Sequence, residues 1–103
     1  MARDTDYQYV IVESFCPFST AGRHGPVHIR PVRGQGLEHT LFVECSKRLS
    51  EDYPVGTMFK IRAKLTDRKH GGEFLYSYHG WAAPKVSPTK ARKFIKDNAP
   101  WVW

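Results

Sequence analysis

Hydrophobic and polar residues alternate strictly along the segment from residue 58 to residue 68. The apolar positions are Phe59, Ile61, Ala63 and Leu65, and the polar ones are Lys60, Arg62, Lys64 and Thr66. A period of two is that of a β-strand, whose successive side chains point to opposite faces. We therefore predict a strand with one apolar face and one cationic face, on which the three positive charges stand about 7 Å apart.

Four further segments are rich in β-branched and aromatic residues, which favour strands. They are residues 7–15, 27–33, 40–45 and 73–81. Pro31 lacks a backbone donor, so its segment is predicted to lie at a sheet edge or in a bulge. The paired glycines at 71 and 72 predict a hairpin connection, and the turn-rich residues 16–26 predict a long loop.

The period changes after Pro84. Ser87 followed by Pro88 is typical of an N-cap and the first helical position. The next turns place apolar residues on one face and basic residues on the other, which predicts an amphipathic helix of about ten residues. The final residues 100–103 are apolar, and we expect them to dock on the body of the protein or on a partner.

These elements predict a mainly β fold of the α+β class. Five strands at short intervals favour a small antiparallel curled sheet or barrel of the oligonucleotide-binding (OB) or SH3-like kind, followed by one short helix. A length of 103 residues is that of one domain. We expect residues 1–103 to form a single domain whose basic helix and apolar tail occupy about residues 87–103.

Charge and composition narrow the classes of function. The net charge is +6, and the segment from Lys85 onward holds five basic residues against Asp97 alone, which places +4 there. Such a patch attracts nucleic acid or other polyanions. The sequence lacks an apolar run of membrane-spanning length and a C-x-x-C motif, and we expect no secretory signal, because residues 1–6 contain no apolar segment. We expect a cytoplasmic protein with reduced, structural cysteines, no membrane association and no cofactor or metal ion.

The first candidate site is the cationic strand face together with Tyr76 and Tyr78 on the predicted return strand. Lys60, Arg62 and Lys64 would contact phosphates, and the two tyrosines would stack on bases if the register places them on the same face. In the opposite register the tyrosines belong to the core, and the charges form an ordinary solvated strand face.

The second candidate site is the segment 23–33, which is dense in arginine and histidine. Arg23, Arg30 and Arg33, with His28 beside them, would bind phosphate oxygens, since a guanidinium group holds two of them in a fork. Alternatively, arginines on an edge strand protect it from pairing with another sheet.

These observations favour a small non-enzymatic module that binds nucleic acid or another polyanion. The enzymatic alternative is a phosphodiesterase or hydrolase centred on His24 and His28, because histidine transfers protons near neutral pH. A third alternative is a protein-interaction module that forms a homodimer through the tail, where Trp101 and Trp103 are typical interface anchors.

Overall fold

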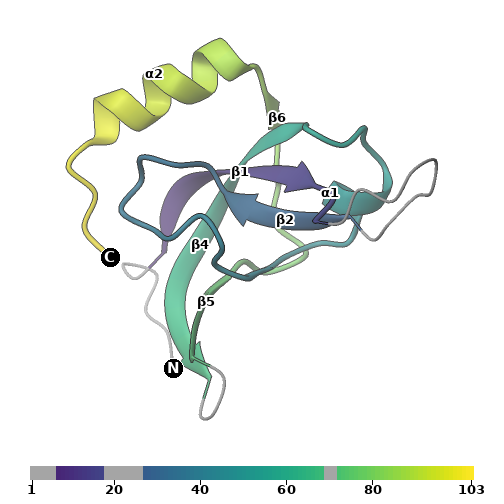
Figure 1. Cartoon of the computed structure of the whole chain (residues 1–103), viewed down its shortest axis with the longest axis horizontal. Coiled ribbons are helices and arrows are strands. Elements are labelled where there is room, and N and C mark those ends of the chain that lie inside the picture. The colour runs from purple at the N-terminus through teal and green to yellow at the C-terminus, as the bar shows by residue number, and fades with distance from the viewer. Residues whose placement is uncertain (1–6, 18–26, 69–71) are drawn as a thin grey trace.

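The computed structural model describes residues 7–17, 27–68 and 72–103. Within these residues the chain forms strands and two helices (Figure 1). The strands are β1 (Gln8–Phe15), β2 (His28–Pro31), β3 (Val43–Glu44), β4 (Met58–Arg68), β5 (Gly72–Tyr76) and β6 (Lys85–Val86). The helices are α1 (Arg48–Glu51) and α2 (Pro88–Asn98).

The strands form one mixed, open sheet in the order β2-β1-β4-β5-β3, and β6 pairs separately with β4. The long strand β4 organises it, because its first half pairs with β1 and its second half with β5. Pro31 lies in the edge strand β2, where its missing backbone donor is tolerated.

The predicted set of five antiparallel strands was wrong in two respects. The sheet has a sixth strand, β6, and the pairing of β3 with β5 is parallel. Several strands are also shorter than predicted. The predicted strand 73–81 ends at Tyr76, because the chain turns between Tyr78 and Trp81, where the Trp81 amide donates to the Tyr78 carbonyl over 3.2 Å. The connection 69–71 lies outside the described residues.

The C-terminal helix agrees with its prediction. The Ser87 hydroxyl oxygen accepts a hydrogen bond from the Lys90 amide over 3.2 Å, and Pro88 is the first helical residue. The helix packs over β1 and β4 (Figure 1). The helix covers part of one face of the sheet, which we call the outer face, opposite the hydrophobic core. Ile11 points to this outer face and is fully buried there because the helix covers it.

The side chain of Gln35 makes hydrogen bonds to the backbone of β1 like those that a neighbouring strand would make. Its side-chain oxygen accepts from the Ile11 amide over 2.7 Å, and its side-chain nitrogen donates to the carbonyls of Ile11 and Val32, each over 2.8 Å. The residue is completely buried. A buried amide whose bonds are all made in this way holds the segment after β2 against β1.

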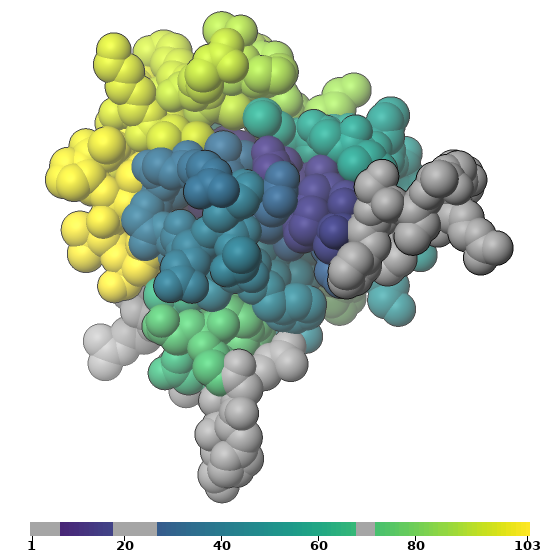
Figure 2. All heavy atoms as spheres, viewed as in Figure 1, coloured from purple at the N-terminus to yellow at the C-terminus, as the bar shows by residue number. Residues whose placement is uncertain are grey.

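The tail packs against its own chain. The Trp103 indole nitrogen donates to the Gln35 carbonyl over 2.6 Å, and the Trp101 indole nitrogen donates to the Ile95 carbonyl over 3.3 Å. Figure 2 shows this C-terminal segment, in yellow, lying against the blue segment that follows β2. The tail thereby joins the end of α2 to the edge of the sheet.

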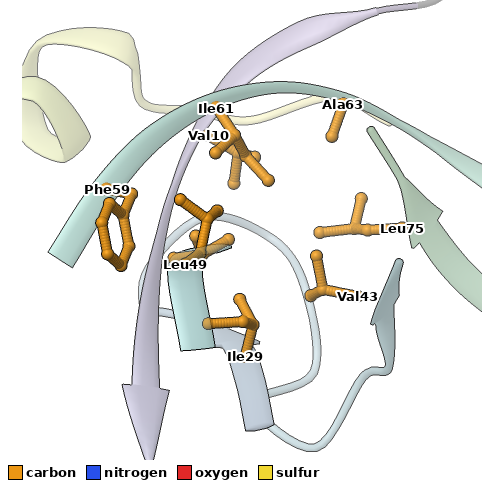
Figure 3. Close-up of a cluster of buried hydrophobic side chains, with 9 residues drawn as sticks. Val10, Ile29, Val43, Leu49, Phe59, Ile61, Ala63 and Leu75 are labelled. Carbon is orange, nitrogen blue, oxygen red and sulfur yellow. The ribbon is translucent and has the colours of Figure 1, made fainter. Parts of the chain in front are cut away.

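The main core fills the concave side of the sheet. β4 bends over the core and contributes Phe59, Ile61 and Ala63, which are buried as their alternation predicts (Figure 3). Val10 lies opposite Ile61 in the register of β1 and points to the same side. Leu49 of α1 closes the core from below the sheet, so the polar side chains of β4 are left on the opposite, outer face.

Candidate nucleic-acid interface

The cationic row of β4 lies on the outer face of the sheet. In the strand register Tyr9 is opposite Arg62, and Lys64 is opposite Tyr76. Residues directly opposite each other in antiparallel strands have neighbouring side chains on one face. The register therefore brings tyrosines from β1 and β5 beside the cations of β4.

Two of the cations lie near aromatic rings of other elements. The Lys60 ammonium nitrogen is 5.1 Å from the ring centre of Tyr9 and 4.8 Å from that of Phe94 in α2. The Lys64 ammonium nitrogen is 5.7 Å from the ring centre of Tyr7. These distances are in the range of cation–π attraction, which favours a fixed position for an otherwise flexible side chain.

Arg62 lies beside a group of three aromatic rings. Its guanidinium carbon is 4.8 Å from the ring centre of Trp81 and 5.6 Å from that of Tyr7. These two rings meet edge to face with centres 5.0 Å apart, and Tyr78 packs on Trp81 at 5.7 Å. Arg62 thus lies beside two rings from distant segments of the chain, and a third ring, that of Tyr78, packs on one of them.

A pocket of about 380 Å³ opens between these side chains. Its lining combines aromatic, basic and apolar residues, namely Tyr9, Lys60, Arg62, Trp81, Ala82 and Pro84. The side chain of Tyr9 remains 54% exposed. Accessible rings offer stacking surfaces for planar groups, and the neighbouring cations attract phosphate, which are the two requirements of single-strand binding.

The structure brings together five of the residues named from the sequence. Lys60, Arg62 and Lys64 share the outer face, and Tyr76 is opposite Lys64. Tyr78 lies beyond the end of β5 and reaches the group through its contact with Trp81.

The described part of the arginine-rich segment lies farther along β1 than the cations of β4. Arg30 forms an ion pair with Glu13 on β1, with 2.7 Å between its Nε atom and the carboxylate, and its guanidinium lies 4.2 Å from the ring centre of Phe15. The exposed His28 ring is 6.0 Å from the same ring. Phe15 and Tyr9 are six residues apart on one strand, or about 20 Å. The register puts Glu13, Arg30 and Phe15 on the same face as Lys60 and Arg62 but farther along β1, and Arg30 contacts Glu13 and Phe15 there.

The remaining candidates of this segment are Arg33, Arg23 and His24. Arg33 is exposed after the end of β2. Arg23 and His24 lie outside the described residues. The predicted catalytic pair of His24 with His28 therefore has one member outside them. Within the described residues, the carboxylate nearest to a histidine is that of Glu13, 3.9 Å from the Nε2 atom of His39.

Sequence reasoning missed the aromatic partners of the cations. Tyr7 and Tyr9 lie in the predicted strand 7–15, Trp81 at the end of the predicted strand 73–81, and Phe94 within the predicted helix. The sequence does place Tyr7 and Tyr9 on one face of the predicted strand 7–15. Pairing of β1 with β4 then puts this face beside Lys60. That pairing is a tertiary fact that no local pattern contains.

A metal site, a reactive thiol and a membrane-spanning helix each have structural requirements that can be compared with the described residues. Among residues 7–17, 27–68 and 72–103, no group of three or more histidine, cysteine, aspartate or glutamate residues is arranged to hold a metal ion. Burial, followed by the charge of Glu44, raises the pKa of the Cys45 thiol to about 11. The helices of the described residues are all too short or too polar to span a membrane.

Comparison of the chain with protein-family models, with curated proteins and with solved structures gave no match. The functional interpretation of the outer face therefore depends on its geometry and chemistry.

Proposed function

We propose that the chain binds single-stranded nucleic acid on the outer face of β1 and β4. The observation that carries this proposal is the row of three cations on β4, each of which lies near at least one aromatic ring; two of them, Lys60 and Arg62, line an open pocket. Bases would stack on the rings, and phosphates would contact Lys60, Arg62 and Lys64. Tyr76 and Tyr78 would extend the aromatic surface.

The shape of the site favours a single strand over a duplex. A base can enter a pocket of about 380 Å³ only when its face is free, whereas the bases of a duplex are stacked on each other. We propose in addition that the fold is of the OB or SH3-like kind, because OB barrels bind oligonucleotides on a curled sheet.

A charge-matched pair of double variants tests the phosphate contacts. Arg62→Ala with Lys64→Ala removes one arginine and one lysine from the proposed face. Lys47→Ala with Arg48→Ala removes the same two residue types at α1, on the opposite side of the sheet. Binding of a labelled oligothymidine is measured by fluorescence anisotropy over a series of salt concentrations.

We expect the first double variant to lower the salt slope of log K by about 1.4, since each phosphate contact to a single strand contributes about 0.7. The second should change the slope and the affinity much less, because these two charges act on the oligonucleotide only through long-range attraction. Equal effects of the two variants would mean that binding follows overall charge, and the proposed face would be wrong.

A further inference from the structure

A second pocket adjoins the first at Tyr9. It has a volume of about 280 Å³ and lies between β1, the end of α2 and the C-terminal tail. Its lining includes Gln8, Phe94, Asn98 and Trp101, and none of its lining residues is charged. It differs in this respect from the first pocket, where Lys60 and Arg62 contribute positive charge.

Tyr9 and Lys60 mark the boundary of the two pockets. Tyr9 lines both of them. The Lys60 ammonium nitrogen lies within about 5 Å of two ring centres, that of Tyr9 at 5.1 Å and that of Phe94, in the wall of the second pocket, at 4.8 Å. A cation therefore stands where a chain passing from one pocket to the other would cross.

Trp101 provides the flat surface of the second pocket. Its ring is stacked on that of Trp103, with centres 6.1 Å apart and planes 8° from parallel. The ring centre of Phe94 lies 5.7 Å from that of Trp101, and the Trp101 indole nitrogen donates a hydrogen bond to the Ile95 carbonyl. An orientation fixed by three contacts reduces the entropy lost when a planar ligand stacks on the ring.

We propose that two successive nucleotides of one strand occupy these two pockets, with the phosphate between them at Lys60. This inference rests on the proposed function of the outer face and adds the C-terminal tail to the binding surface. The first pocket takes a base beside cations, and the second takes a base by stacking alone. Phosphodiester linkage explains why a neutral pocket and a charged one would share a wall.

The two subsites differ in their dependence on salt. Removing a cation from the first pocket lowers the salt slope, because fewer counterions are released. Removing the aromatic face of Trp101 should weaken binding without changing the slope, because stacking releases no counterions. This contrast distinguishes a neutral stacking subsite from a general weakening of the interface.

The test compares Trp101→Leu with Trp101→Phe. Both variants lose the indole hydrogen bond to Ile95 and keep apolar bulk, so any loosening of the tail is common to both. Only phenylalanine keeps an aromatic face. The probe is a labelled oligothymidine of about ten nucleotides, which exceeds the shortest single-strand sites, and affinity is measured by anisotropy at several salt concentrations.

We expect Trp101→Leu to weaken binding at least about fivefold, the lower end of the effect of one stacked base, with an unchanged salt slope. Trp101→Phe should bind within about twofold of the wild type. The proposal is overturned if both variants bind like the wild type, or if both weaken equally.

The outcome also separates this inference from the function on which it rests. Binding by the wild type that depends on Arg62 and Lys64 but not on Trp101 would keep the first pocket and exclude the second. Absence of oligothymidine binding by the wild type at low salt would exclude both.

Discussion

The side chain of Gln35 completes the hydrogen bonding of β1, and its replacement by leucine tests that role. Leucine has a similar volume but no polar atoms. Gln35→Leu would leave the buried Ile11 amide without the acceptor that now lies 2.7 Å away. The Ile11 carbonyl would keep a second donor, the Val32 amide at 3.0 Å. The part-buried Val32 carbonyl would also lose its Gln35 donor, but the largest cost falls on the buried Ile11 amide.

The expected magnitude follows from these contacts. A buried donor left without a partner costs about 1–3 kcal/mol, and each of the two other hydrogen bonds contributes about 0.5–1.5 kcal/mol. The greater hydrophobicity of leucine offsets part of this loss. We expect the free energy of unfolding to fall by about 2–4 kcal/mol, which a domain with about 5–15 kcal/mol survives in the folded state.

Urea unfolding followed by tryptophan fluorescence measures the change. Trp103 donates its indole hydrogen bond to the Gln35 carbonyl, so its emission reports on this part of the fold. Gln8→Leu is the matched control, because among residues 7–17, 27–68 and 72–103 the Gln8 side chain makes a single hydrogen bond, to Val102, near the surface. The control should lose less than about 1 kcal/mol. Equal losses in the two variants would refute the role assigned to Gln35.

Gln35→Glu tests whether the stability of the variant rises or falls with pH. A carboxylate would accept from Ile11 but face the carbonyls of Ile11 and Val32, which now receive hydrogen bonds from the amide. The neutral acid is therefore favoured in the folded state, and its folded pKa lies above its unfolded value of about 4.3. Stability should be highest below about pH 4 and fall as pH rises. A variant more stable at pH 7 than at pH 4, relative to the wild type, would contradict this geometry.

Two further predictions concern Cys45 and the tail. Because the pKa of Cys45 is about 11, only about one thiol in a thousand is ionised at pH 8. Alkylation by iodoacetamide in a Cys16→Ser variant, followed by mass spectrometry, should be slow and accelerate about tenfold per pH unit up to about pH 11; a rate independent of pH would contradict it. Gly36→Ala places a Cβ atom 3.2 Å from that of Trp101 at a φ of +74°, whereas Gly56→Ala, at a φ of +96°, meets nothing within 4 Å. Both should lose about 1–2 kcal/mol through backbone strain, and Gly36→Ala should lose more in urea unfolding and shift the tryptophan emission; equal losses would exclude tight packing of the tail on Gly36.

The sequence predicted the elements with strong periodicity. The strict alternation of β4 and the capping pattern at Ser87 are local signals, and both elements lie where those signals place them. The two-residue strand β6 has no such signal, and β3 (Val43–Glu44) covers only part of the strand predicted over residues 40–45. They exist because β4 and β5 offer them backbone partners, so their positions depend on the assembled sheet. For the same reason, the parallel direction of β3 could not be read from its composition.

The charges of the candidate interface and two of its rings, Tyr76 and Tyr78, were named from the sequence, but the rings that contact the cations were not. The period of two assigned Lys60, Arg62 and Lys64 to one face without any knowledge of the fold. Trp81 and Phe94 reach that face from a turn and a helix, and only tertiary packing brings them there. Arg30 illustrates the opposite case, since its density of charged neighbours suggested an anion site, whereas its guanidinium is paired with Glu13.

The exposure of the aromatic rings argues against a purely structural role for the outer face. A cation–π pair at an exposed site contributes about 0.5–1 kcal/mol. Tyr9 remains 54% exposed and Tyr78 45% exposed. Covering half of a ring of about 200 Å² would contribute about 2.5 kcal/mol at about 25 cal/mol per Å². The pairing with Lys60 therefore recovers less free energy than burial of the Tyr9 ring would. A base stacked on Tyr9 would cover this surface, and the cations beside it would meet the phosphate that the base carries.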